Sequence, residues 1–443
     1  MHDKTAEVNE IVAQGSSTAA LASGADVARG LESQFSSSSD EINYGTVRLQ
    51  PLAYQYDISR LAKDINSART GSSRISAMMD QKGLKCHPKK TVCIAIGTKK
   101  FQEQAKKEVD AEPIKFGDFE VKLVESEVYL GDVISAGGLE KCVEETIKRR
   151  LGKVKGAMYE TKALMEDFQM QAVGGMAGAW DIWELAIIPS LLNNCGSWMG
   201  IGKNIHNTLN ELQYTYLRMI YSCPPSTPLL ALRTQAGMLD MEHRVWTEKV
   251  CLVARLLHTR EDQENLCREV LEVQLAMGWP GLIKEVKEIC CTVGLPDVTM
   301  QYICREEVLE NIRYYDMKMA KTKMAPLEKC RVIRNRDCRH VQPYMFQKSL
   351  AQSRMEFLWE TDMIDTRTTM KGKYEKGKYS CPHCRDGREQ GVLESPAHLL
   401  ITCSAYADLR GGIDPELVLE DRAAFLRKAI LRRKTLEQKL KQK

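Results

Sequence analysis

The feature that most constrains this chain is a group of cysteine and histidine residues near its C-terminal end, in the segment CPHCRDGREQGVLESPAHLLITC. Cys381 and Cys384 are separated by two residues, and His398 and Cys403 follow about one helical turn apart. Two cysteines on a tight turn and a second pair on a short helix can converge tetrahedrally on one Zn²⁺. The spacing therefore predicts a small zinc module.

Four protein ligands leave no open coordination position, so the predicted Zn²⁺ is structural and not catalytic. Its binding, worth about 10–16 kcal/mol, would supply the folding free energy of so small a module. His383 is an alternative ligand, although it lies inside the cysteine turn. The competing interpretation is that these are unrelated residues in a chain with fifteen cysteines.

Basic residues surround this module in the sequence. The segment before it contains Lys371, Lys373, Lys376 and Lys378. The last seventeen residues carry eight Lys or Arg against one Glu, among them Arg432, Arg433 and Lys434. Such runs are commonly solvated faces or tails, but beside a zinc module they predict phosphate contacts with RNA or DNA.

Composition restricts the remaining interpretations. A chain of 443 residues is too long for one compact core and predicts two or three domains. The net charge of +4 does not by itself indicate a nucleic-acid partner. The charged start, MHDKTAEVNE, is not a signal peptide, and residues 177–200 contain Asp181, Glu184 and Pro189, which argue against a membrane span. Scattered cysteines then indicate reduced thiols and an intracellular protein, nuclear or cytoplasmic.

The hydrophobic pattern predicts an α+β fold. A helix after Gly15, a hairpin in LAYQYDIS, a helix ended by Gly83, a buried strand in residues 91–97 and two strands in residues 116–135 make a first domain of residues 1–137. From residue 138 to 366 the pattern is helical, with apolar stripes. The clearest stripes are Val143, Ile147, Leu151, Val154 and Met158, and Ile205, Leu209, Leu212, Tyr216 and Ile220. The zinc module takes residues 367–410, and a basic helix or tail takes residues 411–443.

The order of several short motifs resembles the C-terminal part of a reverse transcriptase from a non-LTR retrotransposon. VAQGSSTAAL resembles the palm motif whose Gln-Gly, here Gln14 and Gly15, lies beside the incoming nucleotide and the template. AYQYDI occupies the place of the aromatic-x-Asp-Asp catalytic turn, and only Asp57 remains there because Tyr56 replaces the first aspartate. Without the resemblance, Gln14 and Gly15 would be a loop before a helix, and Asp57 a turn aspartate.

Two further motifs follow in the same order. GLKCHPKKTVCI resembles the next motif, in which Lys90 would lie near the departing pyrophosphate, although a solvent-exposed lysine is the common alternative. VYLGDVIS resembles the primer-grip hairpin, with Tyr129, Leu130 and Gly131 at its turn. The resemblance implies a partial palm with a small antiparallel sheet, a helical thumb with its extension, and a Cys-Cys-His-Cys zinc module.

The resemblance also implies what this chain lacks. A family palm holds two Mg²⁺ ions between carboxylates. We expect the fingers and the first catalytic aspartate to be absent, and a Tyr56 phenol is a poor Mg²⁺ ligand, so the Mg²⁺ site is incomplete. We therefore expect an RNA-directed DNA polymerase relative that is inactive as a polymerase but keeps nucleic-acid binding. The alternative is a helical protein-interaction scaffold that retains only the fold. No small-molecule substrate or membrane partner is predicted, and the oligomeric state stays open.

Overall fold

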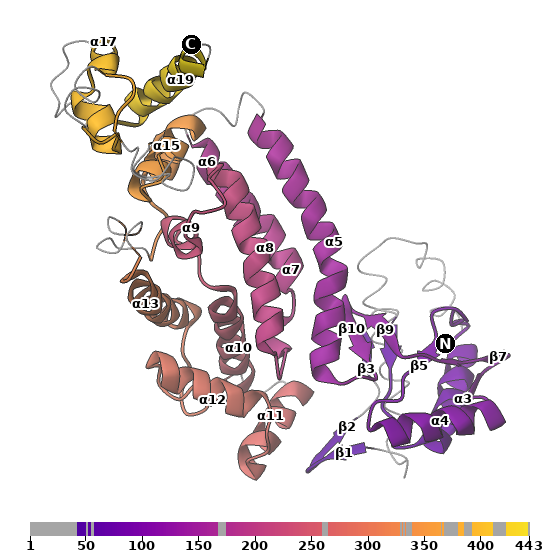
Figure 1. Ribbon diagram of the computed structural model, residues 1–443. Helices are drawn as coiled ribbons and strands as arrows, with labels where there is room; N and C mark the ends of the chain where they lie inside the picture. Colours follow the sequence, from indigo (N-terminus) through magenta and orange to yellow (C-terminus); the bar gives the residue numbers. More distant parts are fainter. Residues whose placement is uncertain are drawn as a thin grey trace, which may run out of the picture.

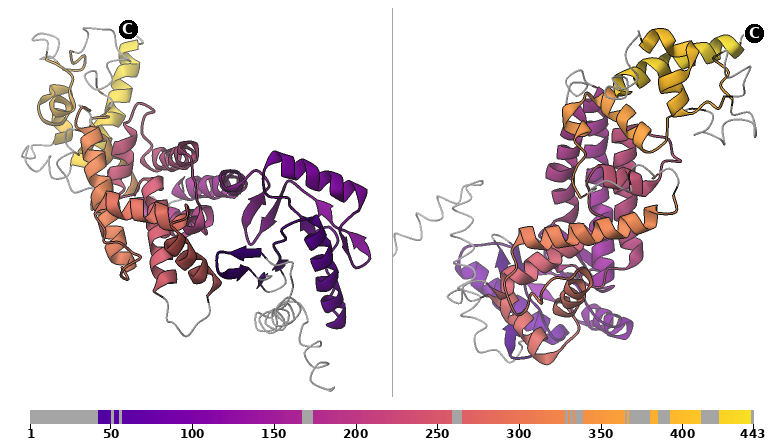
Figure 2. Two further views of the ribbon diagram at one scale, coloured as in Figure 1. Left: turned by 90° about the horizontal axis from the view of Figure 1, so that it is seen from below. Right: turned by 90° about the vertical axis from the view of Figure 1, so that its left-hand side faces the viewer.

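The computed structural model describes residues 42–49, 52–54, 57–166, 174–258, 265–327, 330, 333, 339–364, 366, 380–384, 392–410 and 422–441. Over these residues the protein is mostly helical, with a few small β-ladders near the N-terminal end (Figure 1). The β-ladders and the described C-terminal residues from 380 onward lie at opposite ends of the molecule, and a body of long helices separates them (Figures 1 and 2). This arrangement agrees with the predicted α+β class.

The described strands pair two by two and do not form one sheet. Four of the ladders are antiparallel and one is parallel, which differs from the expected small antiparallel sheet. The antiparallel pairs are β1 (Ile42–Tyr44) with β2 (Val47–Leu49), β3 (Leu52–Tyr54) with β4 (Asp57–Ser59), β6 (Lys115–Phe116) with β7 (Phe119–Glu120), and β9 (Ser126–Tyr129) with β10 (Asp132–Ser135). The parallel pair is β5 (Val92–Cys93) with β8 (Lys122–Leu123). The hairpin predicted in LAYQYDIS is confirmed, since Tyr54 pairs with Asp57.

Two helices support these ladders. The first, α3 (Ile65–Gln81), begins where the Asp64 carboxylate accepts a hydrogen bond from the Ser67 N–H, and its apolar face packs on the small core around Ile114 and Phe116. Gly83, with φ of 69°, follows its end as predicted. The second, α4 (Lys99–Ala111), was not predicted: Phe101, Ala105 and Val109 recur every four residues, but this stripe is short and Ala105 is its single buried residue.

The strand predicted over residues 91–97 is shorter than expected. Only Val92 and Cys93 join a ladder, and both are half-buried. Ala95 is the one buried residue of the segment. Its β-branched and small residues predict a strand inside a sheet. Among the described residues, however, β5 pairs with β8 alone, so it is an edge strand and is only half-buried.

The β9–β10 hairpin has a turn of two residues, Leu130 and Gly131. Both have positive φ, 49° and 88°, which is the conformation of a type I′ turn and matches the right-handed twist of the strands. A leucine in this region is strained, so the surrounding contacts must hold it there. One such contact joins the hairpin to β4, where the Ser59 hydroxyl donates to the Tyr129 hydroxyl at 3.2 Å.

Arg150 ties this hairpin to the helical body. It lies on α5 (Leu139–Glu166), and its guanidinium donates to the Gly131 carbonyl at 3.1 Å and to the Asp132 carboxylate at 2.6 Å. The other end of the same guanidinium donates to the carbonyls of Leu191 and Asn193, at the end of α7 (Ile188–Leu192). One buried side chain therefore fixes the turn, α5 and α7 against one another.

The helical body follows the predicted apolar stripes. Val143, Ile147, Val154 and Met158 of α5 are buried, and Leu151 packs against the same core. All five predicted residues of α8 (Lys203–Tyr221) are buried as well.

The other elements of the helical body are α6 (Gly175–Ile182), the π-helical turn η2 (Trp183–Ile187), the 3₁₀ turn η3 (Cys195–Ser197), α9 (Leu229–Gln235), α10 (Met241–Leu257), α11 (Leu266–Met277), α12 (Leu282–Val293), α13 (Arg305–Met324), α14 (Tyr344–Gln347) and α15 (Leu350–Glu360). None of the helices in the described part combines the length and the apolar character that crossing a membrane requires.

Arg150 offers a stability test. Replacing Arg150 with methionine keeps the aliphatic volume but removes the donor of three carbonyls and the ion-pair partner of Asp132, which keeps only its hydrogen bond from Asn194. We therefore expect the free energy of unfolding to fall by about 2–4 kcal/mol. Its neighbour Arg149 is exposed, and Arg149→Met should change that free energy by no more than about 0.5 kcal/mol. Urea unfolding followed by circular dichroism measures both. Equal effects of the two substitutions would contradict this account of Arg150.

Candidate metal centre

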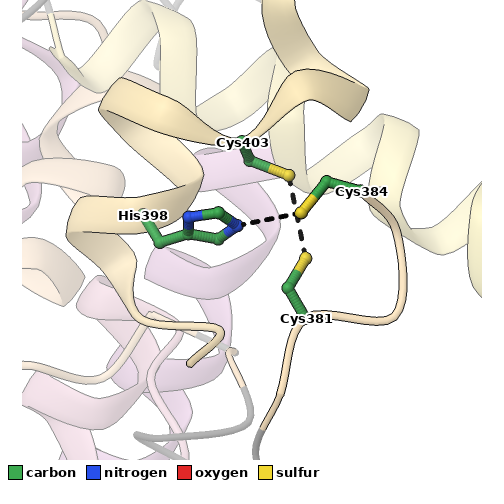
Figure 3. A group of neighbouring side chains, drawn as sticks. All are labelled: Cys381, Cys384, His398 and Cys403. Atoms are coloured by element: carbon green, nitrogen blue, oxygen red, sulfur yellow. Dashed lines mark hydrogen bonds between the residues drawn. The ribbon is translucent and has the colours of Figure 1, made fainter. Parts of the chain in front are cut away.

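The candidate metal centre is built by two short segments, and thirteen residues separate Cys384 from His398. Cys381 and Cys384 lie on a turn that is anchored by an isolated bridge between Ser380 and Leu393 and by the Cys381 N–H, which donates to the Val392 carbonyl at 2.8 Å. His398 and Cys403 lie at the two ends of the helical turn η7 (His398–Thr402). All four side chains point toward one another, as predicted (Figure 3).

The distances between the ligand atoms are those of a metal-binding set. The two sulfurs of Cys381 and Cys403 are 3.7 Å apart, and the Cys384 sulfur is 3.3 Å from His398 Nε2. All four ligand atoms lie within 4.8 Å of one another, and all four residues are buried. Zn–S bonds of about 2.3 Å in a tetrahedron would separate two sulfurs by about 3.8 Å. A disulfide would bring them to about 2.05 Å.

The backbone of η7 corrects one detail of the prediction. His398 and Cys403 are five residues apart, and in an α-helix such residues point about 140° away from each other. The structure instead forms a π-helical turn, in which the Cys403 N–H donates to the His398 carbonyl at 2.8 Å. This wider turn brings the imidazole and the thiol to the same side of the helix. π-Turns of this kind are common at functional sites.

The orientation of the His398 ring is fixed by a contact of Nδ1, the ring nitrogen that does not face the cysteines. Its Nδ1 lies 2.8 Å from the Thr402 hydroxyl. In the tautomer that binds a metal through Nε2, Nδ1–H donates to that oxygen and the lone pair of Nε2 is directed at the cysteines. The Ser395 hydroxyl accepts the backbone N–H of His398 at 3.0 Å and holds the start of the turn. Thr402 was not among the predicted residues, although its position four residues after His398 was visible in the sequence.

One thiol of the Cys381–Cys403 pair is poised to ionise. The two sulfurs share a hydrogen bond, and with Cys403 as its donor this bond, together with the N–H groups of His383 and Cys384, lowers the pKa of Cys381. The same pairing raises the pKa of Cys403, because that residue holds the shared proton. A metal ion in place of this proton would bind both residues as thiolates.

His383, the alternative ligand, is not part of the ligand group. Its imidazole is buried 3.5 Å from the Glu394 carboxylate, and burial lowers its pKa. The Glu394 carboxylate also accepts two hydrogen bonds from Arg433, at 3.1 and 3.0 Å. Glu394 is therefore the centre of a buried polar network next to the metal ligands, and the sequence reasoning did not identify it.

The last helix, α19 (Arg422–Lys441), belongs to the same compact unit. Its residues Phe425, Leu426 and Ala429 share one apolar core with Cys381, Cys384 and Cys403 and with the turn η7. It also packs against α15 and against the short helix α17 (Ala407–Arg410). The predicted zinc module and the predicted basic tail thus pack as one module, here called the C-terminal module, to which the end of α15 contributes.

The burial of Arg433 changes one expectation. Arg433 is only 3% exposed and is paired with Glu394 and Glu437, so its guanidinium is a structural group and not a phosphate contact. Arg432 pairs with Asp408 on the surface of the module. Lys434 is exposed, as a contact residue must be.

The remaining predicted residues fall elsewhere. Gln14, Gly15, Lys371, Lys373, Lys376 and Lys378 lie outside the described residues, as does Tyr56. Asp57 is the first residue of β4, and Lys90 is exposed in a turn closed by its N–H on the His87 carbonyl. Tyr129, Leu130 and Gly131 form the end of the β9–β10 hairpin. Within the described residues, the Cys/His group is the one set of metal-ligand types that lies close enough together to hold an ion.

The metal centre predicts a defined stoichiometry. After refolding with Zn²⁺ and gel filtration, the full chain should carry one ion, whereas Cys384→Ser should carry far less than one, because three ligands bind much more weakly than four. Cys267→Ser is the matched control, since Cys267 is an exposed thiol on α11. Inductively coupled plasma mass spectrometry measures the content. Full metal retention by Cys384→Ser would contradict the assigned ligand set.

Comparisons with known proteins do not assign this chain to a family. No protein-family model matches it, and no curated protein matches it either.

Proposed function

We propose that this protein binds nucleic acid through a zinc-stabilised C-terminal module, and that it derives from the reverse transcriptase of a non-LTR retrotransposon without retaining polymerase activity. The observation that carries the proposal is the closed set of Cys381, Cys384, His398 and Cys403, whose ligand atoms all lie within 4.8 Å. Three thiolates and one imidazole in tetrahedral positions favour Zn²⁺ over harder ions such as Mg²⁺. A site with four protein ligands holds its ion for structure and leaves no position for a substrate.

The ion would give the module a rigid cationic surface. The inner face of α19 packs on the metal-binding core through Leu426 and Ala429, and this fixes which residues point outward. The outward face carries Arg427, Lys428 and Lys434, all of which are exposed. Cations held on a rigid helix can contact consecutive phosphates without the entropic cost of ordering a flexible tail. Polynucleotides are therefore the partner class that this face favours.

The origin of the chain rests on the motifs of its N-terminal part. Two of them, AYQYDI and VYLGDVIS, coincide with the β3–β4 and β9–β10 hairpins, as a palm-derived domain requires. Loss of polymerase activity follows from Tyr56, which stands where a second carboxylate would hold Mg²⁺. A neutral phenol cannot replace that carboxylate, and catalysis by two metal ions needs both.

The nucleic-acid interface can be tested by removing its charge. The triple variant Arg427→Gln, Lys428→Gln and Lys434→Gln should bind single-stranded RNA more weakly. The slope of log Kd against log salt concentration should fall by about 2, because each lost phosphate contact removes about 0.7 from that slope. The matched control removes equal charge from exposed lysines of the helical body, Lys203→Gln, Lys284→Gln and Lys323→Gln. Fluorescence anisotropy at several salt concentrations measures both slopes.

The same titration with Cys384→Ser asks whether the metal centre supports the interface. We expect weaker binding, because α19 loses the core on which it packs. A Kd that does not change with salt concentration, with the triple substitution or with Cys384→Ser would contradict nucleic-acid binding by this module. That outcome would favour the protein-interaction scaffold instead.

Polymerase activity has a direct test. The purified chain with primer–template, deoxynucleoside triphosphates and Mg²⁺ should give no primer extension, measured on a sequencing gel beside an active reverse transcriptase. Tyr56→Asp restores the second carboxylate of the turn. Extension by this variant but not by the unchanged chain would assign the loss of activity to Tyr56, and no extension by either would show that Tyr56 is not its only cause. Clear extension by the unchanged chain would overturn the proposed loss of activity.

A further inference from the structure

A polar cavity lies where the C-terminal ends of α5 and α8 meet the middle of α15. It has a volume of about 540 Å³ and is lined by Lys162 and Glu166 at the end of α5, by Arg218 and Ser222 at the end of α8, and by Arg354 of α15. Contacts between α5 and α8 and between α8 and α15 hold these walls together, and Figure 1 shows α5 and α8 running side by side. The cavity thus belongs to the rigid helical body.

The charges around this cavity are not balanced. Three cations, Lys162, Arg218 and Arg354, face a single carboxylate, Glu166, which is exposed. No Asp or Glu in the described part of the chain lies within ion-pair distance of any of these three cations. Two other buried or half-buried arginines of the described body do have such partners, since Arg233 pairs with Asp316 and Arg244 with Glu184.

Arg218 and Arg354 also have unused donors. The Nε of Arg218 is buried and has no hydrogen-bond partner among the described residues. Arg354 donates its Nε to the Ile220 carbonyl at 2.8 Å and one terminal nitrogen to the Met219 carbonyl, which leaves its other terminal nitrogen without a described partner. Burial lowers the pKa of Arg354, and no nearby carboxylate opposes this. The Nε of Arg218 is the buried donor left without a partner, and such a donor is costly unless an acceptor such as an anion completes it.

We propose that this cavity is a binding site for a phosphate group. Arginine presents a planar fork of donors that matches two oxygens of a phosphate, and Lys162 at the exposed rim adds a third charge. The Ser222 hydroxyl, on a residue held at φ of 48° at the end of α8, supplies a further donor on the cavity wall. The volume exceeds that of one phosphate, so the group is carried by a larger compound or by a polynucleotide backbone. The site does not depend on the function proposed for the C-terminal module.

The test compares two phosphate sources on the full chain. Inorganic pyrophosphate and a ten-nucleotide oligothymidylate are titrated separately by isothermal calorimetry at fixed ionic strength. Arg218→Gln is the main variant, because Arg218 makes no hydrogen bond within the described chain that its loss would break. Arg354 is avoided, since it holds the end of α8. Lys203→Gln, at the first and exposed residue of the same helix, is the matched control.

We expect Arg218→Gln to raise the Kd for pyrophosphate about tenfold or more, which is the effect of one lost charge-assisted hydrogen bond, and Lys203→Gln to leave it unchanged. Arg218→Lys should recover part of the affinity, because it restores the charge without the fork. A response to oligothymidylate that also depends on Arg218 identifies a polynucleotide backbone as the source, and a response to pyrophosphate alone identifies a free phosphate compound. Absence of binding to either probe, or equal Kd values for Arg218→Gln and the unchanged chain, would overturn the proposal.

Discussion

The packing of α8 in the middle of the helical body is the constraint on which the rest of the arrangement depends. This helix contacts α5, α9, α10 and α15, so it is buried over most of its circumference. Its aromatic residues extend the core in two directions. The ring of Tyr216 lies tilted against Trp183, with the centroids 4.7 Å apart, and the ring of Tyr221 is stacked on Phe357 of α15 at 3.9 Å. The Tyr216 hydroxyl donates to the Ala179 carbonyl at 2.5 Å, which satisfies its polar end inside the core. Each truncation in such a core costs about 3–5 kcal/mol, so α8 sets the positions of its neighbours.

The two ends of the molecule are stabilised in different ways. At the N-terminal end, short ladders rely on Arg150 and a small apolar core, because two-residue strands contribute few hydrogen bonds. At the C-terminal end, buried charges meet in pairs, with Arg433 on Glu394 and Arg422 on Glu356. These pairs surround a candidate metal-ligand set of three thiols and one imidazole, and the thiols are small side chains that contribute little packing by themselves. The stability of the C-terminal module therefore depends on satisfying its buried charges and metal ligands as well as on its apolar core.

Sequence patterns predicted the features that repeat or that require special residues. The α5 and α8 stripes were predicted because apolar residues recur every three or four positions over several turns. The metal ligands were predicted because cysteine and histidine at this spacing have few other uses. The helix α4 was missed because its apolar stripe, Phe101, Ala105 and Val109, is short and lies in a largely solvated helix. Arg433 was misinterpreted because a run of basic residues does not reveal which member faces Glu394, thirty-nine residues earlier in the chain. The phosphate cavity joins three helices and leaves no local pattern.

The burial of all four ligands under α19 has a kinetic consequence. With Leu426 and Ala429 in the same core as the cysteines, a chelator cannot reach a bound ion while the helix is in place. Exchange of the ion must wait for α19 to open, so its rate is set by the frequency of that local unfolding and not by the chelator concentration. The lifetime of a bound ion in the site then measures how often α19 detaches from the rest of the module.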